Sequence, residues 1–467
     1  MNNAVVFKNI IRVSIGHGFK LLMGLAIGFI LPVIFTIDDF GYYRVFAIYL
    51  SYIGVLHLGI VDGVYLKYVG YSVEEIAKSG FSSVLFLFSF FEIVFTLIFI
   101  FIAVMFFSGD RQLIFIFFAI NILPINLTSM FQFISQITGR FKEFSSRNII
   151  YSILVLTIII YMYLFKIDDY KFYLLVYTAI NYLVVIWYIF TYRIFFLRNT
   201  SINTKVMHRL KGLISLGIPL LATNFLIIFI LNVPKQIVDF YFDIEVFAIF
   251  SFSFGILSLV SLFIGAIGTV MYPTLHSFSK DSLRKNYDNF NGIISIVSVL
   301  SLVVFFPISM IIETFLPKYN DAIAILVIVF PILVFNASIN IVKVNYYKVL
   351  QKLKEFFIAS LMAIIFIIIA SFSTYFITKS VNAIAFVTLI GVSLWAFLLD
   401  FFLISFAPQK IVRKNIFYSI SIVLFYSIVQ LDYGVLISSL VYLLVISINI
   451  YLFSREFLYA FVKLIRK

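Results

Sequence analysis

The sequence predicts an all-α polytopic membrane protein, and three features support that fold class. Of the 467 residues, 63% are hydrophobic and only 12% are charged, whereas soluble globular proteins usually carry about 25% charged residues. The apolar residues gather in repeated runs of the length that crosses a bilayer as a helix, which is roughly 20 residues. The segments between the runs are short, so we expect no soluble catalytic domain.

About fourteen apolar runs are long enough to be transmembrane helices. They lie near 13–36, 40–60, 80–107, 112–135, 148–165, 172–197, 212–232, 247–272, 291–315, 322–342, 356–378, 381–406, 416–431 and 433–454. The first run follows a basic stretch, but it is too long for a signal peptide and no small-residue cleavage site follows it. We therefore interpret it as an uncleaved first helix.

Basic residues are unevenly divided between alternate loops. Of the 34 lysine and arginine residues, 26 fall in the two termini and in the loops on the same side, and Lys20 and Arg44 lie within or beside spans. The opposite loops hold only Arg111, Lys166, Lys171, Lys235, Lys318 and Lys379. Because cytoplasmic loops carry the excess of basic residues, both termini are predicted to be cytoplasmic. This bias accounts for the net charge of +13 without a nucleic-acid partner.

The chain contains a weak internal repeat. VFAIYLSYIGVL (45–56) and VFAIFSFSFGIL (246–257) are identical at six of twelve positions. These segments occupy equivalent places if helices 1–6 and 7–12 are two copies of one unit in the same orientation, as in parallel-repeat transporters. We therefore expect an N-lobe at 1–200, a C-lobe at 201–410, and two further helices with a cytoplasmic tail at 411–467.

Several stretches resemble the bacterial polysaccharide flippases that move O-antigen and capsule repeat units. FKNIIRVSIGHGFKLLMGLAIGFILP (7–32) and DDFGYYRVFAIYLSYIGVLHLGIVDGVYLKYVG (38–70) are similar to the family's opening, with Gly41 and Tyr42 starting its second helix. In the second half, LKGLISLGIPLLATNFLIIFILN (210–232) and MYPTLHSFSK (271–280) resemble the family's helices 7 and 8. The chain departs from the family where EVFAIFSF (245–252) replaces a Gly-x-Tyr start of helix 8, and where Lys235 replaces an arginine.

The resemblance implies a fold and a substrate. The family belongs to the multidrug, oligosaccharidyl-lipid and polysaccharide exporter superfamily, whose two six-helix lobes form a V-shaped bundle around a hydrophilic cavity. The implied substrate is undecaprenyl diphosphate carrying an oligosaccharide, moved from the cytoplasmic to the periplasmic leaflet of the bacterial inner membrane by alternating access. Expected partners are membrane lipid and the polysaccharide polymerase and chain-length machinery.

Lys20 and His17 lie one helical turn apart in the first span. A lysine here either lines a cavity that holds a diphosphate or extends to the cytoplasmic headgroups, and the sequence leaves both possibilities open. Arg44, close to two aspartates at the outer membrane face, has the same two interpretations. Lys235, near the outer end of the seventh span, is a further candidate for the substrate cavity.

Two acidic residues lie within predicted spans, where an ionisable group is expensive and indicates function by default. Glu92 is close to the middle of the third span and is either a hydrogen-bonded structural acid, a counter-ion to Lys20, or a carboxyl group that couples transport to protons. Asp400, in the inner third of the twelfth span, is either a second coupling group or the partner of a loop lysine.

Neutral polar residues follow one side of the fourth span. Asn121, Ser129, Gln132 and Gln136 recur at roughly helical spacing, which is the pattern of a helix that faces a wet cavity. Their amides suit the binding of sugar hydroxyls, although they also suit hydrogen bonds between helices.

The sequence favours a transporter over an enzyme. It contains no G-x-x-x-x-G-K-[ST] loop for ATP, no histidine or cysteine spacing for a metal, and no sign of another cofactor. A polysaccharide polymerase or ligase would be expected to have a large outer loop. The alternative function is a cation-coupled multidrug exporter of the same fold, which Glu92 favours and the basic candidates oppose.

Overall fold

A computed structural model describes residues 3–197, 200–276, 278–404, 406, 411–431 and 433–465. All its regular elements are helical within these ranges, which confirms the predicted class. Contacts divide the chain into two units, 1–228 and 229–467, and the division falls inside one helix. Each unit is described by itself. The predicted C-lobe end at 410 and part of the predicted interlobe linker, residues 198 and 199, lie outside the described residues.

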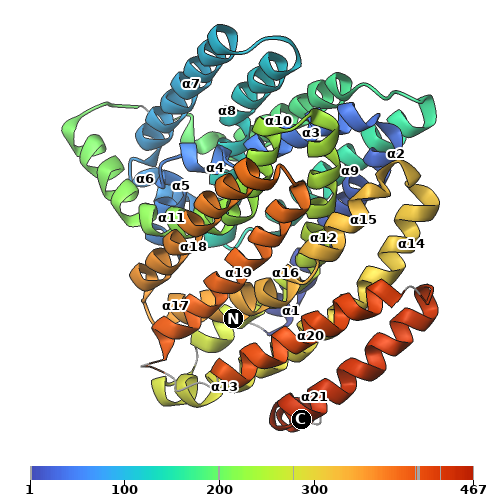
Figure 1. Ribbon diagram of the computed structural model, residues 1–467. Helices are drawn as coiled ribbons and strands as arrows, with labels where there is room; N and C mark the ends of the chain where they lie inside the picture. Colours follow the sequence, from blue (N-terminus) through green and yellow to red (C-terminus); the bar gives the residue numbers. More distant parts are fainter. Residues whose placement is uncertain are drawn as a thin grey trace. The chain divides into compact units, whose positions relative to one another are not determined.

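Unit 1 is built from helices that follow one another with short connections (Figure 1). Its elements are α1 (Asn3–Leu25), the π-helix η1 (Ala26–Ile30), α2 (Leu31–Ile34), α3 (Ile37–Leu50), α4 (Ile53–Leu56), α5 (Ile60–Lys67), α6 (Val73–Lys78), α7 (Phe81–Phe106), α8 (Gly109–Ile137), α9 (Phe141–Phe165), α10 (Tyr170–Thr191), the 3-10 helix η2 (Arg193–Phe195) and the first part of α11 (Thr204–Tyr241).

Unit 2 continues from the second part of α11. Its elements are α12 (Ile244–His276), α13 (Lys280–Leu300), η3 (Ser301–Val304), α14 (Phe305–Phe315), η4 (Pro317–Tyr319), α15 (Asp321–Val329), α16 (Ile332–Ala337), the π-helix η5 (Ser338–Lys343), α17 (Val344–Val349), α18 (Leu353–Thr378), α19 (Val381–Leu403), α20 (Ile411–Leu431) and α21 (Val435–Ile465). The pairs α18–α19 and α20–α21 pack as antiparallel hairpins (Figure 1).

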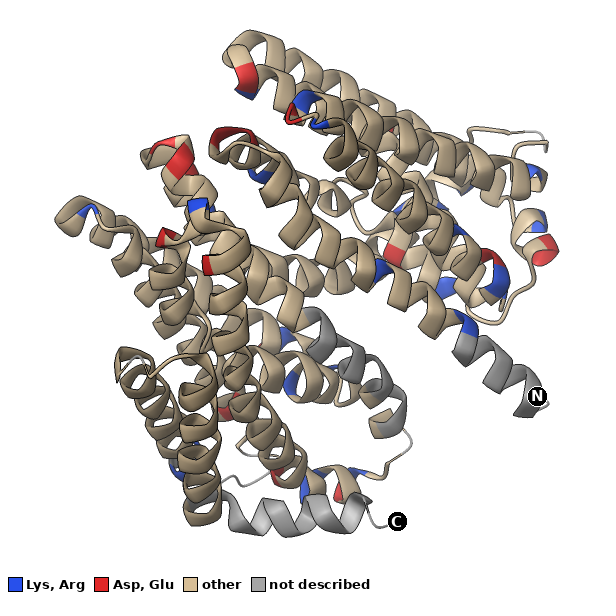
Figure 2. Ribbon diagram, turned by 90° about the vertical axis from the view of Figure 1, so that its right-hand side faces the viewer, with Lys and Arg blue, Asp and Glu red and all other residues tan. Residues whose placement is uncertain are grey.

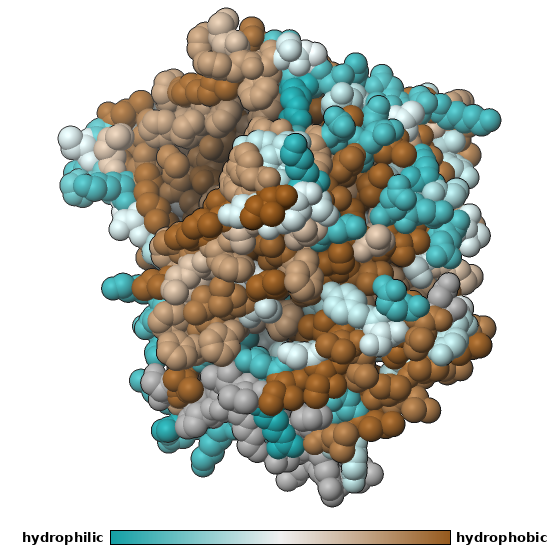
Figure 3. All heavy atoms as spheres, in the orientation of Figure 1, coloured by the Kyte–Doolittle hydropathy of each residue, from teal (hydrophilic) through white to brown (hydrophobic). Residues whose placement is uncertain are grey.

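Within the described residues, twelve helices are long and apolar enough to cross a membrane, and two bent helix pairs raise the number to as many as fourteen. The chain is therefore a multi-pass membrane protein. Long stretches of helix carry no charged side chain (Figure 2), and hydrophobic side chains cover broad areas of the face drawn in Figure 3. Apolar side chains of this kind suit contact with lipid chains. The helical backbone suits the same environment, because a helix satisfies its own backbone hydrogen bonds.

The second predicted span, 40–60, is part of a bent pair of helices. The chain bends by 54° between Ile37–Leu56 and Ile60–Lys67. Leu58 and Gly59 both have positive φ angles, 52° and 78°, which end one helix and redirect the next. The repeat segment at 45–56 ends before this bend and contains the short interruption between α3 and α4, whereas its counterpart at 246–257 lies inside the continuous helix α12.

The tenth predicted span, 322–342, is also broken. It bends by 42° between Asp321–Val329 and Ile332–Val349, with Pro331 at the break, and continues through the π-helix η5. Proline removes a helical hydrogen bond and commonly causes such kinks. The predicted breaks between helices 11 and 12 and between helices 13 and 14 are both present, after Thr378 and after Leu431.

Glycines allow α5 and α11 to touch through their backbones. A Cβ atom added to Gly217 would lie 1.9 Å from the carbonyl oxygen of Gly59, and one added to Gly63 would lie 2.1 Å from that of Leu213. No side chain fits at such separations, so these positions require glycine. This contact fixes the break of the second span against α11 inside unit 1.

Candidate functional site

A polar cavity of about 170 Å³ lies inside unit 1, among α1, α8, α9 and α10. Its lining residues are Lys20, Ile125, Thr128, Ser129, Gln132, Arg147, Asn148, Tyr151, Tyr177, Asn181 and Val184. The lining contains two cationic groups, three amides, two small hydroxyls and two tyrosines, and no carboxylate. A site of this composition attracts an anion and offers both donors and acceptors to hydroxyl groups.

Lys20 reaches this cavity from α1, which packs along α9. The lysine side chain is half-buried, while His17, one turn earlier on the same helix, is exposed and is not part of the lining. Lys20 lines a cavity in this structure, and its part in binding a substrate stays a prediction.

Arg147 supplies the second cation and is almost fully buried, with 3% of its surface exposed. Its guanidinium carbon lies 4.6 Å from the ring centroid of Trp187 and 4.5 Å from that of Tyr188, so the group is held by cation–π contacts. Nη1 donates to the carbonyl oxygen of Glu143 at 3.1 Å and Nη2 donates to the hydroxyl of Thr191. Among the described residues, the buried Nε finds no hydrogen-bond partner.

The polar stripe predicted along the fourth span runs along α8, and its middle faces the cavity. Ser129 and Gln132 line it, and Gln132 Nε2 donates to Asn148 Oδ1 at 3.3 Å. Asn121 lies behind the lining, where its Oδ1 accepts from Asn181 Nδ2 at 3.1 Å. Gln136, one turn beyond Gln132, is half-buried and does not line the cavity.

Two predicted basic residues lie elsewhere. The guanidinium carbon of Arg44, on α3, lies 5.9 Å from the ring centroid of Phe40, and this side chain is not in the cavity lining. Lys235 belongs to the part of α11 in unit 2, where it is 7% exposed and its Nζ lies 5.8 Å from the ring centroid of Phe254.

Glu92 lies in the middle of α7 and is 1% exposed. It makes no ion pair in the described part of the chain, so it is not a counter-ion to Lys20 in this structure. Its Oε2 accepts a hydrogen bond from Asn126 Nδ2 at 2.8 Å, and the same Nδ2 donates to the carbonyl oxygen of Ile53 at 3.2 Å.

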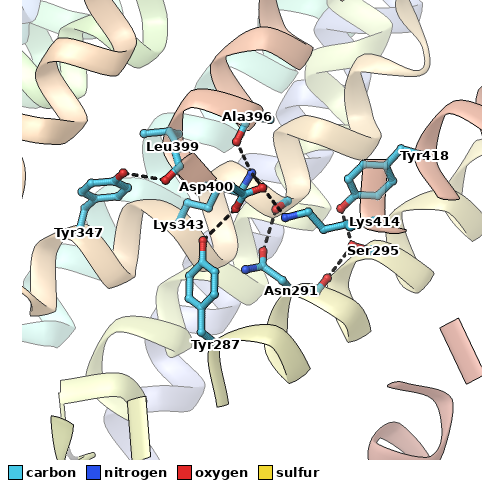
Figure 4. Close-up of polar contacts among 11 residues, drawn as sticks. Tyr287, Asn291, Ser295, Lys343, Tyr347, Ala396, Leu399, Asp400, Lys414 and Tyr418 are labelled. Atoms are coloured by element: carbon cyan, nitrogen blue, oxygen red, sulfur yellow. Dashed lines mark hydrogen bonds and ion pairs between the residues drawn. The ribbon is translucent and has the colours of Figure 1, made fainter. Parts of the chain in front are cut away.

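Asp400 is the centre of a buried ion network in unit 2 (Figure 4). Its carboxylate accepts from the Tyr287 hydroxyl at 3.0 Å, lies 3.1 Å from Lys343 Nζ, and is paired with Lys414. Lys343 is completely buried and also donates to the carbonyl oxygen of Ala396 at 2.7 Å. The network joins α13, η5, α19 and α20, and Lys414, which the sequence places in a loop, lies in the first turn of α20.

The sequence does not single out three basic residues that the structure places at buried polar positions. These are Arg147 in the cavity of unit 1, and Lys343 and Lys414 in the Asp400 network. Each lies within one or two residues of a predicted helix end, so a count of basic loop residues assigns it to the cytoplasmic surface. The structure places all three inside helices, α9, η5 and α20, and in contact with buried polar groups. The predicted span starts at 148, whereas the helix α9 starts at Phe141 and so includes Arg147. A basic residue next to a predicted span end is therefore a signal that the residue can lie inside the helix.

In the residues that the structure describes, no three His, Cys, Asp or Glu side chains are grouped so that they could hold a metal ion.

The fold is similar to that of solved membrane transporters. It matches a lipid II flippase, MurJ, in an inward closed conformation with a TM-score of 0.71 and 16% identity, over 97% of this chain and 100% of that one. It matches an inward-facing multidrug resistance MATE transporter of the MOP superfamily with a TM-score of 0.58 and 13% identity, over 88% and 98% of the two chains.

A third similar structure is a MOP superfamily transporter from Pyrococcus furiosus, described as having a binding pocket of reverse polarity that suggests a different function. Its TM-score is 0.50 at 12% identity, over 85% of this chain and 94% of that one. The sequence matches no protein-family model and no curated protein. At these identities the likeness establishes the fold alone, which this chain shares with the three transporters.

Proposed function

We propose that this protein is a flippase for an undecaprenyl-diphosphate-linked oligosaccharide, moving it from the cytoplasmic to the periplasmic leaflet by alternating access. The observation that carries the proposal is the cavity of unit 1, in which Lys20 and Arg147 are combined with amides and hydroxyls and with no carboxylate. A diphosphate presents negative charge for two cations, and the attached sugars present hydroxyl groups for the amides.

The two cations have complementary properties in this role. Lys20 is a flexible, compact charge on a half-buried side chain, whereas Arg147 is fixed between two rings and offers its Nε. Arginine binds phosphate oxygens with planar geometry and lysine acts as a point charge. The fold supports the proposal, because one similar structure is itself named a lipid II flippase.

The proposed setting is the bacterial inner membrane with both termini in the cytoplasm. An O-antigen repeat unit is the proposed glycan, and the polymerase and chain-length machinery would receive the product. The basic-residue bias of the loops and the resemblance to polysaccharide flippases support this setting.

The alternative is a cation-coupled multidrug exporter, since a MATE transporter shares the fold. The charge of the cavity distinguishes the two functions. A lining with two cations and no carboxylate repels the cationic compounds that a drug exporter of that kind would carry.

Transport by the purified chain in liposomes tests the proposal. A fluorescent undecaprenyl-diphosphate oligosaccharide is placed in the inner leaflet, and its arrival in the outer leaflet is measured with a membrane-impermeant quencher. We expect the wild type to move the lipid, and Lys20→Ala to move it about tenfold more slowly, or slower still. Lys205→Ala, a change at an exposed position at the start of α11, is the matched control and should transport normally. Uptake of ethidium without lipid movement would reject the flippase in favour of the exporter.

A further inference from the structure

The cavity of unit 1 is lined by an asparagine whose orientation is fixed. Asn181, on α10, is 8% exposed and belongs to the lining. Its Nδ2 donates to the carbonyl oxygen of Tyr177 at 3.0 Å and to Asn121 Oδ1 at 3.1 Å. Because a backbone carbonyl only accepts hydrogen bonds, the contact with Tyr177 identifies the nitrogen end of the Asn181 amide. Both hydrogen atoms of that nitrogen are bound to protein, so Asn181 can offer the cavity only its acceptor, Oδ1.

The groups behind Asn181 hold it in this orientation. Asn121 Nδ2 donates to the carbonyl oxygen of Phe117 at 2.8 Å and to Thr178 Oγ1 at 2.7 Å. The Thr178 hydroxyl in turn donates to the carbonyl oxygen of Leu174 at 2.8 Å. A backbone carbonyl therefore fixes each amide nitrogen of the chain, and turning either amide by half a turn would bring oxygen atoms face to face.

A second lining group also offers the cavity only an acceptor. Ser129, on α8, donates its hydroxyl hydrogen to the carbonyl oxygen of Ile125 at 3.0 Å, so its Oγ can accept but not donate. The charged side chains of Lys20 and Arg147, in contrast, can only donate. The cavity thus combines cationic donors with neutral acceptors.

A diphosphate alone would match only the cationic part of this lining. Its ionised oxygen atoms accept from Lys20 and Arg147, but they carry no hydrogen atom for Asn181 or Ser129. A buried acceptor that a ligand leaves without a donor costs about 1–3 kcal/mol in general. The hydroxyl and amide N–H groups of a sugar supply the missing donors.

The dimensions of the cavity suit one phosphate with one attached sugar. Its volume of about 170 Å³ is below the roughly 300–1,000 Å³ of pockets that enclose drug-sized ligands, so only part of a large head group fits. Asn181 precedes Tyr188, whose ring packs on Arg147, by seven residues, which is about 10 Å along α10. The neutral acceptor and the buried cation therefore face different parts of one ligand.

We propose that Asn181 is a specificity-determining residue that accepts a hydrogen bond from the sugar next to the phosphate, so that the cavity binds a glycosyl phosphate in preference to a phosphate alone. This inference rests on the flippase function proposed above, because it concerns how the same cavity recognises the head group. Lys20 and Arg147 bind the phosphate, and Asn121 is a positioning residue that holds Asn181 from behind. Sugars farther from the phosphate are not recognised in this cavity.

Thermal unfolding of the purified full-length protein in detergent tests the inference with two soluble probes. N-acetylglucosamine 1-phosphate and methyl phosphate are both phosphate monoesters, but only the first carries hydroxyl and amide N–H donors. A ligand that binds only the folded state raises the Tm as its concentration rises, so each titration yields an affinity. We expect the sugar phosphate to bind about tenfold more tightly than methyl phosphate, and Lys20→Ala to weaken both.

Asn181→Leu removes the acceptor at nearly constant size. It should lower the affinity for the sugar phosphate about tenfold, to that of methyl phosphate, and leave methyl phosphate binding unchanged. Asn121→Leu should cause part of the same loss, because it releases the Asn181 amide. Asn449→Leu is the matched control, since Asn449 is an equally buried asparagine of α21 that donates to Ser421 in unit 2, and it should keep the full preference.

The possible outcomes separate this inference from the flippase proposal. Equal affinity of the wild type for the two probes would overturn the role of Asn181 without any variant, so poor folding of Asn181→Leu does not prevent a decision. A preference that survives Asn181→Leu would overturn it too. In both cases methyl phosphate binding that depends on Lys20 leaves the flippase proposal intact, whereas binding of neither probe would reject the anion cavity and both proposals with it.

Discussion

Asp400 is a buried carboxylate whose contacts join several helices of unit 2. Its carboxylate contacts Lys343 and Lys414 and accepts a hydrogen bond from the Tyr287 hydroxyl (Figure 4). Removing one partner of a buried pair leaves an uncompensated charge, and this is more damaging than replacing the whole pair with apolar groups.

We predict that Asp400→Asn destabilises the protein by about 3–5 kcal/mol, the usual effect of breaking a buried pair. The loss should appear as a lower Tm in detergent, and adding Lys343→Met to the Asp400→Asn variant should restore part of it. Asp281→Asn, at an exposed position in the first turn of α13, is the control. An unchanged Tm for Asp400→Asn would show that the network contributes little to stability.

Arg147 differs from Asp400 because it lines the cavity of unit 1 and its Nε makes no hydrogen bond to the described residues. We predict that Arg147→Lys lowers the rate of lipid transport about tenfold, although the charge is kept, because lysine has neither the Nε donor nor the planar group that lies between Trp187 and Tyr188. The measurement is the liposome assay, with Arg193→Lys at an exposed position as the control. Wild-type transport by Arg147→Lys would mean that only a charge is needed at this position.

At the scale of elements, the two helix breaks distinguish this chain from a simple bundle. At the break in the second span, the backbone of Gly59 packs directly against Gly217 of α11. A Cβ atom added to Gly217 would lie only 1.9 Å from the Gly59 carbonyl oxygen. The helix α11 has 38 residues, which at 1.5 Å per residue makes it about 57 Å long, and it passes from unit 1 into unit 2.

Alanine at position 217 should force α5 away from α11. We predict that Gly217→Ala lowers stability by about 1–3 kcal/mol or more, the usual range for overpacking. Gly212→Ala lies on the same helix with nothing within 4 Å of the added carbon, so it should be neutral or slightly stabilising. Tm values of the two variants measure the difference, and equal values would contradict the close contact.

At the scale of the whole molecule, the bias of basic residues predicts the orientation in the membrane, with both termini in the cytoplasm. The chain has no cysteine, so single cysteines report directly on the side they occupy. We predict that Asn320→Cys reacts with an impermeant maleimide on intact cells stripped of their outer membrane, and that Asn203→Cys reacts only after permeabilisation. Both positions are exposed. The reverse pattern would place the termini outside and overturn the orientation inferred from basic residues.

The sequence alone determined the class of this protein and located about as many spans as the twelve to fourteen candidates that the described residues contain, because crossing a bilayer requires long apolar runs and a helical backbone. It also identified Lys20, Gln132 and Asn121, which the structure brings to or just behind one cavity. Such candidates can be found because a polar group in an apolar run is conspicuous in one dimension, and their role in binding a substrate stays a prediction.

Only the tertiary structure decided which polar groups meet. Arg147, Lys343 and Lys414 resemble loop residues in the sequence, because the ends of helices are marked weakly and a shift of a few residues moves a charge from surface to interior. The breaks at Leu58–Gly59 and Pro331, and the meeting of Glu92 with Asn126 and Ile53, depend on contacts between helices distant in the chain. Hydrophobic pattern determines that a segment is buried, whereas packing and hydrogen bonding in three dimensions determine its partners.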